Sequence, residues 1–168
     1  MTGRPAVLFP LFAGVETLTG IGEKTARAME QLGIARPRDM VLTLPHGVID
    51  RRPVRSIREI VPPVVASVEV EVVAHWPARK RGAPSRVQVR DAEAEFSLVF
   101  FHARGDYLEK TLPIGARRLV SGKIELFDGF AQMTHPDHIL PPEEAARLPR
   151  FEPVYPLGAG VTQRVMAK

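Results

Sequence analysis

From residue 64 onward, hydrophobic and polar residues alternate with a period of two. Val68, Val70 and Val72 are separated by single glutamates, which predicts a strand with one buried face. The same alternation returns over residues 86–90, 95–102, 118–126 and 130–134. The last two runs flank Asp128-Gly129, a dipeptide typical of a tight β-hairpin. The pattern therefore predicts five short strands.

A helix is predicted over residues 105–112, between the third and fourth strands. Five strands with a helix in this position give the element order of an OB-fold barrel, which binds oligonucleotides on the face of its second and third strands and through two of its loops. On the second strand, Val87 and Val89 are expected to face inward, and Arg86 and Arg90 outward. We therefore expect an α+β protein whose larger part is a five-stranded OB-fold barrel.

Residues before the barrel show helical spacing instead. We expect one helix over residues 10–17, a second that ends at Leu32 with Gly33 as its left-handed cap, and a third that begins at Pro37. The expected division of the chain is a helical module, the barrel and a proline-rich linker, over residues 1–60, 61–140 and 141–168.

Gly20-Ile21-Gly22 lies between the first two expected helices, at the centre of a helix-hairpin-helix-like pattern. Two glycines allow a tight turn that directs free N–H groups of the next helix at an anion, and Lys24 adds positive charge. Such contacts bind DNA backbone phosphates without reading sequence. The alternative is a turn that joins two packed helices, with Ile21 in the core.

The composition is that of a globular domain: 168 residues, 45% hydrophobic and 25% charged. The absence of cysteine excludes disulfides and thiolate catalysis and agrees with a cytoplasmic protein. No apolar run reaches about 18 residues, so we expect no membrane association.

Basic residues outnumber acidic ones by 23 to 19, and only five of the 23 are lysine. Arginine suits phosphate because its planar guanidinium donates two parallel hydrogen bonds. One basic cluster spans residues 36–58, and the other follows the first strand and comprises Arg79, Lys80, Arg81, Arg86 and Arg90. Clusters on both sides of the first strand indicate nucleic-acid binding, with a solvated surface as the alternative.

Phe101 is expected on the outer face at the end of the third strand, near Tyr107. An exposed aromatic ring beside basic residues can stack on an unpaired base. Alternatively, both rings pack beneath the helix.

Signals of catalysis are weak. Glu23 separates Gly22 from Lys24, so the segment does not fit a nucleotide-binding P-loop. His135 and His138 lack a third ligand for a metal. We therefore expect the chain alone to be no enzyme and to hold no cofactor.

The order of several motifs resembles the N-terminal part of the bacterial RecG family of ATP-dependent DNA helicases. These motifs are residues 18–34, 39–45, 50–52, 100–101, 122–123, 133–136 and 153–157. The resemblance implies a wedge domain that grips stalled forks and Holliday junctions and splits strands during branch migration and fork regression. It also implies that two motor domains with ATP and magnesium sites follow in the parent protein.

Carried over to this chain, the resemblance makes Phe101 and Tyr107 the aromatics that cap the opened bases. It further implies a nucleoid-associated protein, and we expect a monomer. The competing hypothesis is an OB-fold adaptor that binds a protein partner and no nucleic acid.

Overall fold

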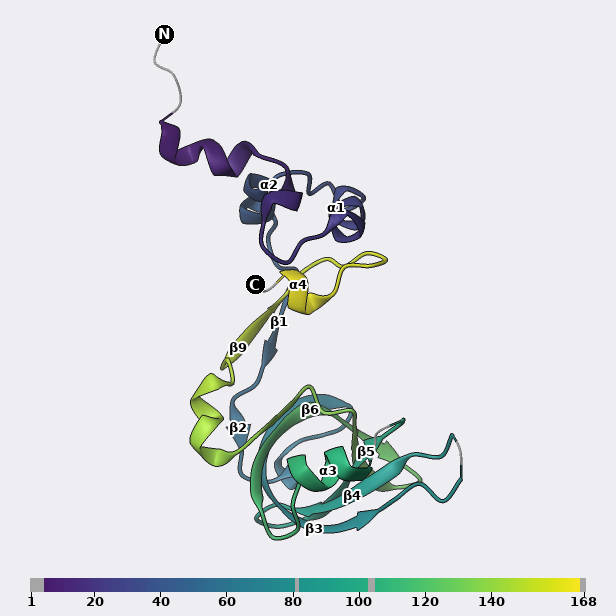
Figure 1. Ribbon diagram of the computed structural model, residues 1–168. Coiled ribbons are helices and arrows are strands. Elements are labelled where there is room, and N and C mark those ends of the chain that lie inside the picture. Colours follow the sequence, from purple (N-terminus) through teal and green to yellow (C-terminus); the bar gives the residue numbers. More distant parts are fainter. Residues whose placement is uncertain (1–4, 81, 103–104, 167–168) are drawn as a thin grey trace. The chain divides into compact units, whose positions relative to one another are not determined.

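The computed structural model of the protein describes residues 5–80, 82–102 and 105–166. The chain folds into two compact units, one formed by residues 1–49 together with 153–168 and the other by residues 50–152. Each unit has its own hydrophobic core. The class is α+β, as predicted, with one large sheet and few short helices (Figure 1).

Residues 50–152 form the barrel (Figure 1), and the helix α3, Gly105–Thr111, packs its buried Leu108 against the barrel core. The five predicted strands are present as β3 Val64–Trp76, β4 Ser85–Arg90, β5 Glu95–Phe100, β6 Arg117–Phe127 and β7 Phe130–Thr134. Two short strands not predicted from the sequence join the same sheet: β2 Pro53–Val54 and β8 His138–Leu140. The remaining elements of this unit are the 3-10 turns η3 Ile57–Glu59 and η4 Pro142–Arg147.

The barrel closes because β6 pairs antiparallel with both β3 and β7, while β7 pairs parallel with β5. The alternating valines of β3 point inward, and Val68, Val70 and Val72 are at most 2% exposed. Leu112, directly after α3, is fully buried in the same core. The period of two therefore predicted the buried face of this strand correctly.

Two turns use left-handed backbone. Asp128 and Gly129 have φ values of 51° and 80° and form the predicted hairpin. His102 has a φ of 59°, and β5 accordingly ends at Phe100, two residues earlier than expected.

The other unit contains η1 Ala6–Phe12, η2 Val15–Thr17, α1 Glu23–Glu30, α2 Pro37–Leu42 and α4 Gln163–Met166. The single helix expected over residues 10–17 is wrong: two 3-10 segments occupy this region. Pro10 lies inside the first of them and cannot donate a backbone hydrogen bond, and Gly14 is extended between the two. The strands β1 Gly47–Asp50 and β9 Phe151–Val154 form a separate two-stranded sheet. Within the described ranges, no helix is long and apolar enough to cross a membrane.

Candidate nucleic-acid interface

Phe101 and Tyr107 both lie at the surface of the barrel and face the same hollow. Phe101 directly follows β5 and is 42% exposed, and Tyr107, on α3, is 56% exposed. The hollow has a volume of about 570 Å³, and His102 and His135 also line it. The structure thus brings together the two aromatic residues that the sequence singled out.

His135 sets the position of Phe101. Its Nε2 accepts a hydrogen bond from the Phe101 backbone N–H at 3.1 Å, and the two rings lie 5.8 Å apart. The His135 backbone N–H in turn donates to the Val99 carbonyl at 2.9 Å. Because Nε2 accepts, the proton of the neutral ring is on Nδ1. This histidine, which also has a left-handed φ of 47°, fixes the Phe101 backbone where β5 ends.

The loop between β3 and β4 carries exposed cations beside this hollow. Arg79 and Lys80 are exposed and line a second hollow of about 360 Å³, and Arg81 lies outside the described residues. His102 lines both hollows, which therefore adjoin. No ion pair of the described residues includes Arg79 or Lys80, so both charges are available to a ligand.

Arg86 and Arg90 leave the outer face of β4, as expected, but they lie in different surroundings. Arg90 forms an ion pair of 2.7 Å with Glu95. The hydrogen bond from Arg90, followed by one from Gln88, lowers the pKa of Glu95 below its usual value. Arg86 has no acidic partner in the described part of the chain and lines a separate groove with Trp76. Of the described basic residues after the first strand, Arg86 and Arg90 therefore do not line the hollow of Arg79 and Lys80.

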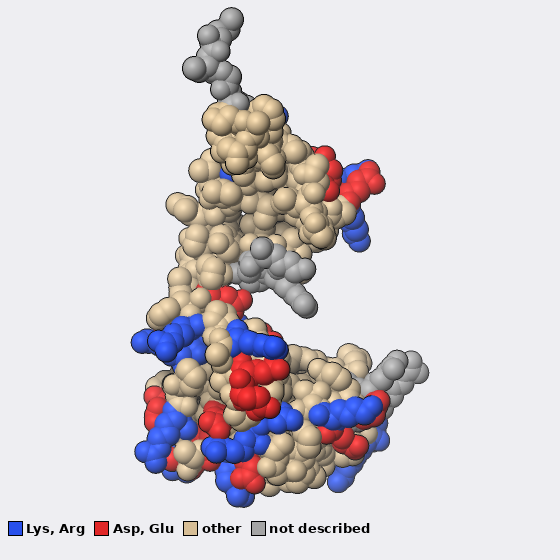
Figure 2. All heavy atoms as spheres, turned by 60° about the vertical axis from the view of Figure 1, so that its left-hand side comes forward, with Lys and Arg blue, Asp and Glu red and all other residues tan. Residues whose placement is uncertain are grey.

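Most other exposed arginines of the barrel unit are paired with carboxylates. Figure 2 shows Lys and Arg interspersed with Asp and Glu over the barrel on the face it draws. The pairs include Arg52 with Asp50, Arg55 with Glu93, Arg117 with Glu69 and Arg147 with Glu144. The excess of arginine in the sequence thus overstates the number of cations free to bind phosphate.

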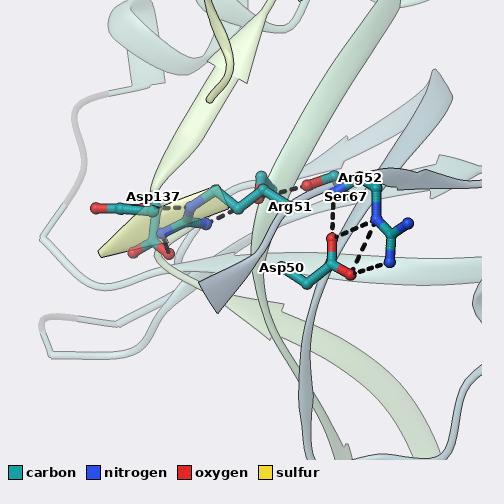
Figure 3. Close-up of polar contacts among 7 residues, drawn as sticks. Asp50, Arg51, Arg52, Ser67 and Asp137 are labelled. Carbon is teal, nitrogen blue, oxygen red and sulfur yellow. Dashed lines mark hydrogen bonds and ion pairs between the residues drawn. The ribbon is translucent and has the colours of Figure 1, made fainter. Parts of the chain in front are cut away.

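Arg51 has a role that the sequence did not indicate. It was counted in the basic cluster of residues 36–58, but its side chain is only 3% exposed. It donates to Glu152 at 2.5 Å, to Ser121 at 2.8 Å and to Asp137 at 3.0 Å, and Ser67 donates to Ser121 (Figure 3). Arg51, next to the first residue of the barrel unit, therefore binds Glu152, its last residue, and is not a surface cation.

Arg51 forms an ion pair with Asp137, and its charge also acts on the neighbouring His138. Burial, and then the charge of Arg51, lower the pKa of His138, which favours the neutral ring. Among the described residues, no three of His, Asp or Glu are placed to hold a metal ion.

The glycine turn before α1 has open space around both glycines. Gly20 has a φ of 87°, Gly22 caps α1, and a Cβ on either would meet no atom within 4 Å. Lys24 is exposed in the first turn. Ile21 is partly buried and packs against the core of its own unit, whereas Gly20 and Gly22 are exposed.

Sequence analysis missed three exposed aromatic residues of the seven-stranded barrel sheet: Trp76, Phe127 and Phe130. Each stands at the end of a strand, next to a loop or to the Asp128-Gly129 turn. Their position at strand ends could have indicated exposure, because an aromatic side chain beside a loop is seldom needed to fill a barrel core.

Comparison with known proteins gives a consistent result. A family model described as the RecG wedge domain matches residues 15–168. The chain is 28% identical over 173 residues to the ATP-dependent DNA helicase RecG of Escherichia coli O157:H7, and equally to that of strain K12. These alignments cover 100% of this chain and 24% of each relative, so the chain spans about a quarter of the length of the curated relatives it matches.

A solved structure of RecG bound to a three-way DNA junction matches the fold with a TM-score of 0.70. The match has 21% sequence identity and covers 92% of this chain and 21% of the other. The chain therefore shares its fold with that protein.

Proposed function

Because the chain belongs to the RecG wedge domain family, we propose that its barrel grips the branch point of DNA junctions, such as stalled forks and Holliday junctions, and keeps the separated strands apart. The proposal rests on one observation: two hollows of the barrel surface meet at His102. One presents the exposed rings of Phe101 and Tyr107, and the other presents the cations Arg79 and Lys80.

The two hollows perform different tasks in this proposal. Arg79 and Lys80, with Arg81 in the same loop, neutralise backbone phosphates and release counterions, which supplies affinity without sequence preference. The rings of Phe101 and Tyr107 stack on the base pair that the barrel interrupts, at about 1–3 kcal/mol per base. That stacking offsets part of the cost of unpairing, so the branched shape is preferred over continuous duplex.

Further phosphate contacts are proposed at Arg86, Arg90 and the glycine turn. Arg90 has to exchange Glu95 for a phosphate, so we expect a smaller contribution from it than from Arg86. The accessible backbone of Gly20 and Gly22, with Lys24, is proposed to take a phosphate at the start of α1.

The activity of the whole protein is part of the same proposal. The relatives are ATP-dependent DNA helicases, and the solved neighbour is bound to a three-way junction. We propose that motor domains in the rest of the parent protein hold ATP and magnesium and pull DNA against this wedge during branch migration and fork regression in repair and recombination. The wedge itself consumes no ATP, and it acts as a monomer in the cytoplasm, at the nucleoid.

The test is a fluorescence-anisotropy titration of the chain with three-way, four-way and linear DNA of equal nucleotide number. We expect junctions to bind at least about tenfold more tightly than duplex, and affinity to fall steeply with salt. Equal affinity for junction and duplex would contradict the proposal.

One observation favours the alternative of a protein-binding adaptor. Three apolar residues at and just after the end of α2 are each more than 70% exposed: Val41, Leu42 and Leu44. Such an apolar patch suits a protein partner. The same titration separates the two functions, because an adaptor would bind all three DNAs weakly and with little dependence on salt.

A further inference from the structure

His135, the residue that follows β7, has a backbone conformation that is uncommon for residues other than glycine. Its φ of 47° lies in the left-handed region. Two contacts hold it there: its N–H donates to the carbonyl of Val99 at 2.9 Å, and the next residue, Pro136, lies against Gly122 of β6. A Cβ on Gly122 would stand 3.1 Å from the Cα of Pro136, so the two segments approach as closely as glycine allows. Such backbone persists where the surrounding structure holds it, and it clusters at functional sites.

This backbone directs the imidazole of His135 at Phe101. Nε2 accepts a hydrogen bond from the Phe101 backbone N–H at 3.1 Å. The ring of Phe101 lies 5.8 Å from the imidazole and is tilted by 31°, and the buried ring of Phe100 meets the imidazole at 85° and 6.1 Å. One hydrogen bond and two aromatic contacts therefore set the orientation of the imidazole, and through it the place of Phe101.

The hydrogen bond to Phe101 requires the neutral form of His135. A neutral imidazole with its proton on Nδ1 offers Nε2 as an acceptor, whereas an imidazolium carries N–H donors on both nitrogens. Protonation would turn one donor toward another, so the bond would be lost and the Phe101 N–H would turn to water. Histidine is the side chain whose charge ordinarily changes between about pH 5 and pH 8. The place of Phe101 is therefore open to control by a proton.

Other titratable groups surround the imidazole. Three of them line the same hollow, on α3 and after β5: Asp106, Tyr107 and His102. On the segment of His135 itself, Asp137 is paired with Arg51 at 3.0 Å, and the charge of Arg51 also acts on His138. Each of these groups can respond to pH, so an experiment has to separate their response from that of His135.

We propose that His135 is the positioning residue of Phe101: its neutral imidazole holds the ring ready to stack at the branch point, and protonation releases the ring. Strand separation by the wedge then weakens as pH falls, whereas the grip on the junction, which comes from Arg79 and Lys80, does not weaken. The inference rests on the proposed function in using the stacking role of Phe101. It adds the residue that controls this role and the chemical signal to which that residue responds.

Two amide variants of His135 separate the acceptor from the rest of the side chain. In His135→Gln the amide reaches the place of Nε2, and in His135→Asn it reaches only the place of Nδ1. Neither amide gains a proton in this range of pH. Asparagine also tolerates left-handed backbone, so His135→Asn should keep the fold and leave the Phe101 N–H without its acceptor. Thermal melting followed by circular dichroism verifies the fold of both variants.

The measurement is the emission of 2-aminopurine at the branch point of a three-way junction bound by the full chain, at about pH 8 and about pH 5.5. The parent should lose about half or more of the rise in emission at the lower pH, because a hydrogen bond of this kind changes the population of the held state about fivefold. His135→Gln should give the full rise at both pH values, and His135→Asn the reduced rise at both.

A second readout needs no DNA. The amide hydrogen of Phe101, followed by NMR at a single pH, should exchange about fivefold faster in His135→Asn than in the parent or in His135→Gln. Two further histidine variants serve as controls: His46→Gln, at an exposed position of the other unit, and His102→Asn, in the hollow itself. Both should keep the parental response to pH, whatever the size of the rise in His102→Asn.

A rise that is equal at both pH values in the parent, or a pH response that persists in His135→Gln, overturns the inference. Loss of the pH response in His102→Asn alone overturns it in favour of His102. Equal exchange of the Phe101 amide in His135→Asn and in the parent overturns it as well. Fluorescence anisotropy measures junction affinity separately: if junction preference persists beside any of these results, the wedge function stands and only the role of His135 falls. Equal affinity for junction and duplex contradicts the wedge function, and the inference with it.

Discussion

The backbone N–H of Phe101 donates to Nε2 of His135, which joins the end of β5 to the residue that follows β7. The ring of Phe101 is therefore presented at a position set by two neighbouring strands of the barrel, and not by a free loop. A stacking surface held in this way does not have to be ordered when DNA arrives, which lowers the entropic cost of binding.

Replacement of Phe101 by alanine should impair strand opening more than binding. Stacking on the interrupted base pair and the cost of opening it offset each other, so we expect junction affinity to change by less than about threefold. The measurement is the emission of 2-aminopurine placed at the branch point, which rises when the base unstacks from its neighbours. Phe101→Ala should lose most of this rise, whereas Phe101→Tyr should keep it; an unchanged rise in the alanine variant would assign Phe101 a packing role.

The loop cations should affect all DNA shapes alike. Replacing both Arg79 and Lys80 by alanine should weaken junction and duplex binding by the same factor and reduce the slope of log affinity against log salt by about two. Arg147→Ala is the matched control, because this exposed arginine is already paired with Glu144. Loss of junction binding with no change in the salt slope would show that the loop does not contact phosphates.

Arg51 should matter for stability and not for DNA. Arg51→Met leaves Glu152 and Asp137 without their shared cation and should lower the free energy of unfolding by about 3 kcal/mol. Arg52→Met is the neighbouring control, because the Arg52–Asp50 pair is exposed and screened by solvent, so its loss should change the free energy of unfolding little. Urea titration followed by circular dichroism measures both, and equal losses in the two variants would contradict the internal role of Arg51.

The barrel should lose stability in acid, in part through Asp91. Burial of this carboxyl raises its pKa, but hydrogen bonds from the backbone of Glu93, Ile57 and Ala94 and from the Ser56 hydroxyl outweigh burial and lower the pKa below 3.8. A carboxyl with a lower pKa in the folded state stabilises the fold above its unfolded value, and this contribution disappears as pH falls through the folded value.

Urea unfolding of the parent chain and of Asp91→Asn tests this between pH 7 and pH 2. We expect the variant to be less stable at pH 7 and its stability to depend less on pH below about 4. Asp128→Asn, in an exposed turn, should keep the pH dependence of the parent. Parallel curves for the parent and Asp91→Asn would show that another carboxylate is responsible.

The barrel could be predicted from the sequence because its strands bury one face each. Alternation at Val68, Val70 and Val72 directly reflects the pleat, and Asp128-Gly129 is suited to left-handed backbone. The segment around Pro10 could not be predicted in the same way, because short 3-10 turns have no periodic apolar face that distinguishes them from a helix.

The distribution of charged residues along the sequence predicted the binding surface less well than the hydrophobic pattern predicted the barrel. Arg51 and Arg52 are adjacent and chemically identical, yet one is buried and the other exposed. The partners mark the buried position, since Ser67 and Ser121 are hydroxyl residues that are themselves fully buried. Such pairings depend on register between β3 and β6, which a sequence pattern does not contain.

Asp50 and Glu152 are the first and last residues of the barrel unit, and Arg51 ties these two ends together. The Arg51 backbone N–H also donates to the carbonyl of Arg150 at 2.9 Å. The barrel unit is thus an insertion in the chain of the other unit. The strands that enter and leave it are joined through Arg51. An inserted domain whose ends lie close together tolerates changes of length or sequence without a change in the course of the chain that carries it.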